Sequence, residues 1–285
     1  MTTRSTTTPA PSFVTASLRI FDLSLSEMLW SRRSVFLALV VGGPVIVALI
    51  AALVELFNLP ALRVNGVRVG GNVIFGTMIW MLYLRVIVPI LGVFYGTSLI
   101  ADEVEDKTIT YLFTRPIPRG AVLVGKYLAY LACTVLIVLP SVMVVYFLVM
   151  PLGGRGMAGI ASGFPSLLED LGLLALGLAV YGAVFAFIGA QLKRPLLFGL
   201  FFAFGWEFVV MWIPGYLRRF TVAYYLQSLV PHTMPQEGGV GSLLQTVFQD
   251  HPPVWVSLMA LAVILVVFLG LAARAVERRE YVLEQ

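Results

Sequence analysis

Six long apolar runs constrain the fold of this chain more than any other feature. Each run is long enough to cross a hydrocarbon layer of about 30 Å as a helix that rises about 1.5 Å per residue. The runs are residues 35–57, 73–101, 122–150, 167–192, 195–213 and 254–276. Soluble domains carry about 25% charged residues, whereas 12% of this chain is charged and 59% is hydrophobic. The sequence therefore predicts an all-α integral membrane protein with six transmembrane helices.

The residues before the first run divide into two parts. Residues 1–16 are rich in Thr, Ser and Pro, and we predict that they form a disordered tail. In residues 17–33, apolar side chains recur at helical spacing while polar side chains point elsewhere. The apolar residues are Leu18, Phe21, Leu25 and Met28. The pattern predicts an N-terminal amphipathic interfacial helix, with a short cytoplasmic helix away from the membrane as the alternative.

The distribution of Lys and Arg predicts the orientation in the membrane. Thirteen of these residues fall on one side of the predicted spans and five on the other. Cytoplasmic loops carry the excess of Lys and Arg, so both termini are predicted to be cytoplasmic. The long loop 214–253 is then extracytoplasmic, and its apolar content indicates short helices that dip into the membrane edge. Residues 34–285 form one six-helix transmembrane domain in this interpretation.

The densest group of polar residues is the loop 102–119, on the predicted cytoplasmic side between the second and third runs. Four carboxylates come first, followed by a stretch with Ile109, Leu112 and Phe113 on one side, and then by two prolines flanked by arginines. Early carboxylates are typical of a helix start, and prolines end a helix. A short amphipathic helix with a charged rim is suited to docking a soluble partner. Metal binding by the carboxylates is the alternative, but no complementary ligands follow.

The loop and its flanks resemble the signature of type-2 ABC exporter permeases. That signature has an acidic residue, Gly-Thr, a few apolar residues, Pro-x-x-Arg and then Gly-Lys. The matching residues here are Glu105, Thr108, Leu112, Pro116, Arg119, Gly125 and Lys126. Lys107 stands where the family usually has Gly. The whole chain is also similar to this family in its amphipathic first helix, six spans, cytoplasmic ends and long outer loop.

The resemblance implies that the loop 102–119 is a coupling helix that docks on a separate ABC ATPase subunit. The residues implied in ATPase coupling are Glu103, Glu105, Asp106, Thr108, Leu112, Phe113, Arg115, Pro116 and Arg119. The resemblance also implies two ATPase copies, a second permease copy or close paralogue that completes a dimeric translocation path, and a prokaryotic plasma (inner) membrane. The alternatives are an ion-coupled or passive carrier and a non-transporting membrane assembly subunit. Few charges along the spans favour an amphipathic or lipid-like cargo.

The sequence offers no candidate for a catalytic, cofactor-binding or metal-binding residue in this chain. Residues 120–127 almost match the phosphate-loop pattern GxxxxGK[ST], but Tyr127 stands where Ser or Thr would bind Mg²⁺. ATP and Mg are therefore expected on the partner ATPase. His232 and His251 lack the spacing of metal ligands. The basic residues are too scattered for a nucleic-acid interface.

Charged residues inside the predicted spans are candidates for function, because a charge in the hydrocarbon layer is costly. Arg85 lies roughly 22 Å above the inner face along the second span, and Glu207 lies roughly 20 Å above it along the fifth. These similar depths predict an intramembrane polar pair between Arg85 and Glu207. The alternative is that each residue lines a watery cavity separately or snorkels.

Overall fold

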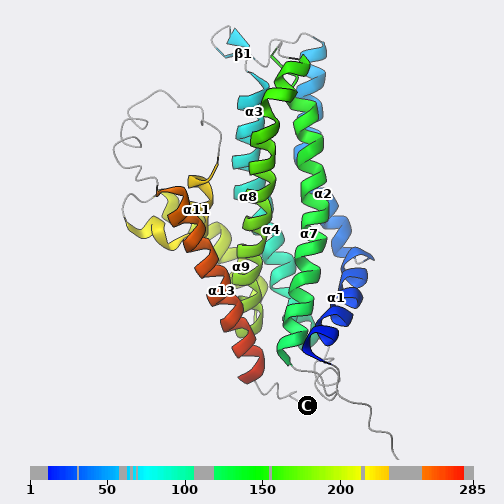
Figure 1. Cartoon of the computed structure of the whole chain (residues 1–285), viewed down its shortest axis with the longest axis vertical. Helices are drawn as coiled ribbons and strands as arrows, with labels where there is room; N and C mark the ends of the chain where they lie inside the picture. Colours follow the sequence, from blue (N-terminus) through cyan, green and yellow to red (C-terminus); the bar gives the residue numbers. More distant parts are fainter. Residues whose placement is uncertain are drawn as a thin grey trace, which may run out of the picture.

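The computed structural model describes residues 12–30, 32–57, 63–64, 67–68, 70–105, 119–153, 156–212, 216–230 and 252–278. Nearly all of these residues are helical, and the helices form an elongated bundle (Figure 1). At one end of the bundle, β1 (Arg63–Val64) pairs antiparallel with β2 (Val67–Arg68). The predicted all-α class is confirmed.

Among the described residues, five helices are long and apolar enough to cross a membrane. They are α2 (Arg32–Leu56), a composite second span, α7 (Arg119–Val149), α8 (Gly156–Gln191) and α13 (Val254–Arg278). In the predicted fifth run, α9 (Pro195–Leu200) and η4 (Phe201–Trp206) form a shorter apolar helix, and α10 (Glu207–Trp212) continues it. We call it the fifth helix. Five of the six predicted spans are therefore confirmed by length and composition. The span predicted for the fifth run, residues 195–213, stays a prediction.

The second span is a continuous helix that contains two π-helical segments. It runs through α3 (Gly71–Met78), the π-helical η2 (Ile79–Ile87), α4 (Val88–Leu91), the π-helical η3 (Gly92–Gly96) and α5 (Ser98–Glu105). Pro89 has no N–H, so it cannot donate to the carbonyl oxygen of Arg85 four residues earlier. The fifth helix contains a third π-helical segment, η4. Such segments are frequent at functional sites.

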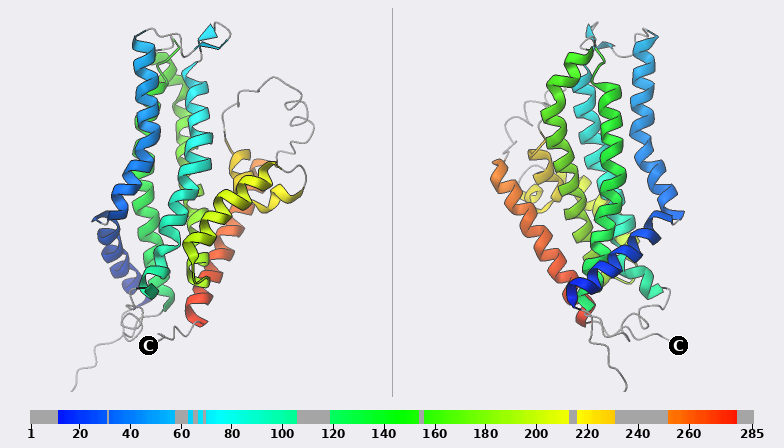
Figure 2. Two further views of the ribbon diagram at one scale, coloured as in Figure 1. Left: turned by 180° about the vertical axis from the view of Figure 1, so that it is seen from behind. Right: turned by 45° about the vertical axis from the view of Figure 1, so that its right-hand side comes forward.

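The amphipathic first helix is α1 (Phe13–Trp30), which crosses α7 obliquely near one end of the bundle (Figure 2). It begins four residues before the predicted start, where the Ser12 hydroxyl accepts a hydrogen bond from the Thr15 N–H at 3.3 Å and caps the helix. The residues that it buries recur at helical spacing. They are Ala16, Ser17, Ile20 and Ser24. Most of the predicted disordered tail, residues 1–11, lies outside the described part.

Beyond the fifth helix lie two short helices, the 3-10 helix η5 (Tyr216–Phe220) and α11 (Val222–Ser228). Both lie about half-way along the long axis of the molecule, at the level where α13 begins (Figures 1 and 2). The prediction of short helices in the loop 214–253 is confirmed for its described part. Residues 231–251 of that loop lie outside the described part.

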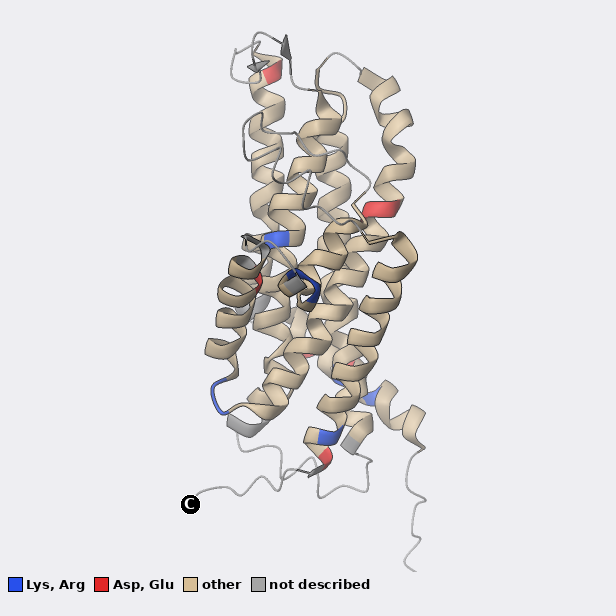
Figure 3. Ribbon diagram, turned by 90° about the vertical axis from the view of Figure 1, so that its left-hand side faces the viewer, with Lys and Arg blue, Asp and Glu red and all other residues tan. Residues whose placement is uncertain are grey.

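Helix α8 forms the centre of the bundle. In its apolar stretch 61% of the residues are buried, against 22% in α2 and 17% in α13. The outer helices therefore present large apolar side chains to their surroundings, as expected where lipid is the solvent. Figure 3 shows long stretches of the bundle without charged residues.

Small residues let α8 approach its neighbours closely. A methyl group placed on Gly189 would lie 2.3 Å from the carbonyl oxygen of Thr97, and one placed on Gly182 would lie 2.2 Å from the ring of Tyr130. Gly182, Ala186 and Ala190, which are spaced four residues apart on α8, are all buried. Backbones can pack this closely only where side chains are absent or very small.

Hydrogen bonds between helices add to this packing. The hydroxyl of Tyr127 donates to the carbonyl oxygen of Ala179 at 2.7 Å. The hydroxyl of Tyr130 donates to the carbonyl oxygen of Leu178 at 3.0 Å. These bonds join α7 to α8. Lipid gives little hydrophobic drive for helices to associate, so close contacts and interhelical hydrogen bonds stabilise the bundle.

We expect Gly189→Ala to destabilise the bundle by about 1–3 kcal/mol, because the added methyl would overlap the Thr97 carbonyl oxygen and force the helices apart. Gly172→Ala is a matched control in the same helix, with nothing within 4 Å of the added methyl. It should be neutral or stabilising by up to about 1 kcal/mol. Unfolding equilibria in detergent measure both changes, and equal stabilities of the two variants would contradict the close contact.

Candidate functional site

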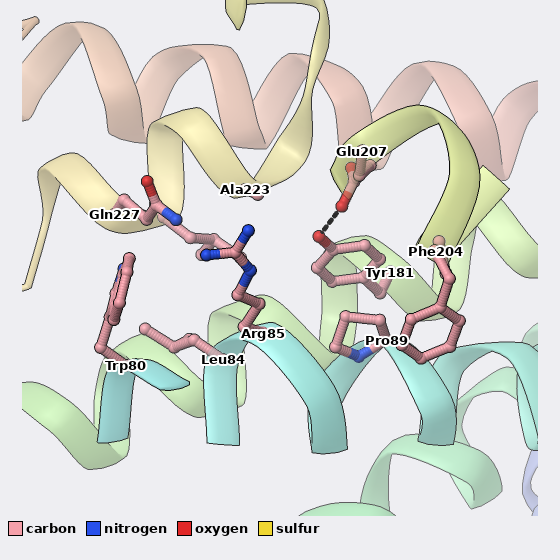
Figure 4. A pocket seen from close by; sticks show the side chains of 11 residues that line it. Trp80, Leu84, Arg85, Pro89, Tyr181, Phe204, Glu207, Ala223 and Gln227 are labelled. Carbon is pink, nitrogen blue, oxygen red and sulfur yellow. Dashed lines mark hydrogen bonds between the residues drawn. The ribbon is translucent and has the colours of Figure 1, made fainter. Parts of the chain in front are cut away.

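A small pocket lies where the second span, α8, the fifth helix and α11 meet (Figure 4). Its walls are mostly apolar, and four polar side chains project among them: Arg85, Tyr181, Glu207 and Gln227. The remaining lining residues are Trp80, Leu84, Pro89, Ala203, Phe204, Ala223 and Leu226. The cavity is about 30 Å³, which suits one small polar group rather than a whole small molecule, whose pockets are usually about 300–1,000 Å³.

Glu207 begins α10, directly after the π-helical η4. It is 3% exposed, so its carboxylate needs partners inside the protein. The hydroxyl of Tyr181 donates to Oε2, and the backbone N–H of Val222 donates to Oε1 at 3.0 Å. Glu207 therefore ties the fifth helix both to α8 and to the start of α11.

The start of α11 explains why its backbone can donate to a carboxylate. Thr221 is the N-cap residue, and its hydroxyl accepts a hydrogen bond from the Tyr224 N–H at 3.4 Å. The N–H groups of a first helical turn have no partner within the helix. Glu207 accepts one of them, from Val222, and the negative charge is favourable at this end of the helix dipole.

Arg85 belongs to the π-helical η2 and is half-buried. Its guanidinium carbon lies 5.6 Å from the ring centroid of Trp80, within the range of a cation–π interaction. In Figure 4 the guanidinium extends towards α11, whereas the Glu207 carboxylate points to Tyr181. The two charged ends therefore point to different neighbours.

The structure brings Arg85 and Glu207 to one pocket, as their depths along the spans predicted. The hydrogen bonds described for the carboxylate come from Tyr181 and Val222. Opposite charges in a medium of low dielectric attract each other beyond hydrogen-bond distance. A direct Arg85–Glu207 pair stays a prediction.

Sequence reasoning missed two polar residues of α8. Tyr181 is completely buried and donates to Glu207, but a tyrosine in an apolar run gives no signal without the fold. Asp170 is also completely buried. It is a carboxylate inside a predicted span, so the rule that selected Glu207 would have found it. Asp170 lies about 16 Å from Tyr181 along the helix, outside the pocket lining.

The predicted coupling residues are described only at the two ends of the loop. Glu103 and Glu105 lie in the last turn of α5, and Arg119 is the first residue of α7. The carboxylates were expected at a helix start, but the described ones end the second span, because that span continues beyond the apolar run. The other predicted coupling residues lie outside the described part: Asp106, Thr108, Leu112, Phe113, Arg115 and Pro116.

The Gly-Lys part of the signature lies inside α7, so residues 120–127 are helical and form no phosphate loop. Gly125 has a clear packing role. A methyl group there would lie 2.6 Å from the Ser17 carbonyl oxygen and 2.9 Å from Cβ of Ile20. The backbone of α1 therefore crosses α7 at Gly125.

These features define a multi-pass helical membrane protein with a mostly apolar pocket that holds four polar side chains, and with a connecting segment at one end. The chain matches the family described as "ABC-2 family transporter protein" over residues 18–281, and it belongs to that family. It is therefore a membrane permease subunit of an ABC transporter, a class that works with an ATPase partner. A comparison with curated proteins found no match.

We expect the Tyr181–Glu207 hydrogen bond to contribute measurably to stability. A double-mutant cycle of Tyr181→Phe and Glu207→Ala should give a coupling of about 1–3 kcal/mol, because either change alone leaves a buried polar group without its partner. Tyr146→Phe is the control, since the Tyr146 hydroxyl donates to the carbonyl oxygen of Ile160 instead. Its effect should add to that of Glu207→Ala, and additivity in both cycles would refute the Tyr181 bond.

A second cycle, of Arg85→Ala and Glu207→Ala, tests the predicted intramembrane pair in the same unfolding measurement. Coupling above about 0.5 kcal/mol would support the pair. Purely additive effects would show that Arg85 and Glu207 act separately.

Proposed function

We propose that this chain is the permease subunit of an ATP-driven exporter. It forms the translocation path as a dimer, with a second copy or a close paralogue. Two copies of a separate ABC ATPase bind ATP and Mg and dock on the loop 102–119. Both termini and this loop face the cytoplasm, and the chain resides in a prokaryotic plasma (inner) membrane. The support comes from the family and from the geometry at one end of the bundle.

One observation carries the proposal: α7, the helix that follows the loop, meets both α1 and α13 beside the loop. A methyl group on Gly120, next to the loop, would lie 3.7 Å from Cε2 of Phe13 in α1 and 3.8 Å from Oε1 of Glu277 in α13. Helix α5, which leads into the loop, packs on α7 at the same end. A partner that docks on this loop would therefore act on α1, α5, α7 and α13 together.

The continuity of α7 supports the transmission of such a movement. α7 runs as one helix from Arg119 to Val149, with Pro140 inside it, and α1 rests on it at Gly125. At its far end, a methyl group on Gly71 would lie 2.2 Å from the carbonyl oxygen of Val149. A displacement at the loop would thus reach α1 at once and α3 at the opposite end.

The surface of the bundle supports a membrane-embedded dimer. Helices α2 and α13 expose large apolar side chains along their length, including Leu39 at 72% and Val266 at 69%. Such a surface suits lipid or the matching surface of another permease copy. The dimer partner itself is part of the proposal.

Phe113→Ala should weaken association with the ATPase, because losing an aromatic anchor from an interface can cost about 2 kcal/mol or more. Glu105→Arg should slow or misdirect docking through charge repulsion. The measurement is co-purification with a co-expressed partner ABC ATPase, together with transport-coupled ATP turnover.

Two matched changes on the predicted outer side are the controls, Phe220→Ala and Glu237→Arg. Phe220 is 74% exposed in η5, so its truncation should leave ATPase association unchanged. All four variants should insert with normal topology, because no apolar span is altered. Full ATPase binding and turnover by both loop variants would rule out this loop as the transmission element.

A further inference from the structure

The pocket that contains Arg85 and Glu207 lies in the half of the membrane farther from the proposed cytoplasmic end. Ser228, the last residue of α11, shares a hydrogen bond of 2.7 Å with Ser257 of α13. At the helical rise of about 1.5 Å per residue, Ser257 lies at most about 31 Å above Arg278, the last residue of α13. This height is close to the hydrocarbon thickness of about 30 Å. Glu207 lies roughly 20 Å up the fifth helix. The pocket between these levels therefore falls in the outer leaflet.

One lining residue of the pocket also lies at the outer surface of the fifth helix. Phe204, which lines it, is 39% exposed, and the nearby Trp206 is 40% exposed. The buried walls of the pocket behind Phe204 are apolar, with Ala203, Leu84 and Leu226. An acyl chain could lie against these side chains without losing its apolar surroundings, whereas a small hydrated ion could not.

The charges determine which headgroup fits. Both oxygens of Glu207 accept hydrogen bonds from within the protein, and the carboxylate points to Tyr181 (Figure 4). The Arg85 guanidinium extends into the space beside Gln227, in Figure 4, and its five N–H donors can serve a ligand as well as internal contacts. Guanidinium groups bind phosphate and carboxylate with two parallel hydrogen bonds.

We propose that this pocket binds an amphipathic molecule with an anionic headgroup, a phosphate or a carboxylate. Arg85 contacts the anion, Gln227 lies beside it, and the apolar tail leaves past Phe204 into the outer leaflet. The inference rests on the proposed function only in naming this molecule as the cargo of the exporter. Binding itself requires neither ATP nor the ATPase.

Fluorescence of Trp80, which lines the pocket beside Arg85, reports on occupancy. The full chain is prepared with Trp80 as its single tryptophan, with Trp30, Trp206, Trp212 and Trp255 changed to Phe. It is placed in phosphatidylcholine vesicles that contain increasing fractions of phosphatidylglycerol with brominated acyl chains. A parallel series uses brominated phosphatidylcholine. We expect stronger quenching by the anionic lipid, with saturation at a low lipid fraction.

Two variants separate a pocket from general contact with lipid. Arg85→Gln should raise the lipid fraction at half-maximal quenching by roughly tenfold or more, because it removes a charged hydrogen bond to the headgroup. Ala203→Leu retains Arg85 but fills the pocket, so it should also reduce the excess quenching. If Arg85 only snorkelled to the membrane surface, Ala203→Leu would not change the excess quenching of Trp80. A single-tryptophan protein with Trp255, which is 65% exposed on α13, should be quenched equally by both lipids.

Added inorganic phosphate distinguishes an amphipathic ligand from a small anion. Millimolar phosphate should leave the excess quenching in place, and its complete loss would overturn the amphipathic ligand. Equal quenching of Trp80 by the two lipids, or excess quenching that survives both variants, would overturn the site. If the site fails while Phe113→Ala still uncouples the ATPase, the exporter proposal stands without this cargo.

Discussion

The bundle depends on direct contact between helix backbones at α8. A membrane gives helices little hydrophobic reason to associate, so their attraction must come from close packing and hydrogen bonds. Glycine at 182 and 189 lets a tyrosine ring and a neighbouring carbonyl oxygen approach the α8 backbone directly. The hydroxyls of Tyr127 and Tyr130 then use second lone pairs of α8 carbonyl oxygens. The pocket depends on this packing, because α8 positions Tyr181 so that its hydroxyl can donate a hydrogen bond to Glu207.

Polar groups and irregular helix geometry occur together in this protein. Arg85 lies within the π-helical η2, and Glu207 directly follows the π-helical η4. A π-helical turn adds a residue to the helix and rotates the side chains after it, so it can turn a polar residue away from the lipid. Both charged residues line the same pocket, from two different helices.

The sequence was sufficient for the features that depend on local composition. Apolar runs located five spans, and counting residues from the inner face placed Arg85 and Glu207 at matching depths. The beginning of α8 at Gly156 was missed, because Pro165 and several glycines weaken the helical signal there, although the surrounding bundle supports the helix. The Glu207 partners could not be predicted either. They depend on the chain turning back through η5, which brings the Val222 N–H to a residue fifteen positions earlier.

The contact between α1 and α7 at Gly125 has a consequence for biosynthesis. Helix α1 is made first, but the surface that it covers is made roughly a hundred residues later, on the order of ten seconds at ordinary translation rates. Until then α1 needs another place for its apolar side chains. Val14, Leu18 and Leu23 remain exposed even after α1 has packed on α7, at 65%, 58% and 70%. The lipid surface can hold these side chains throughout, so α1 can wait at the membrane and dock only after the third span has been inserted.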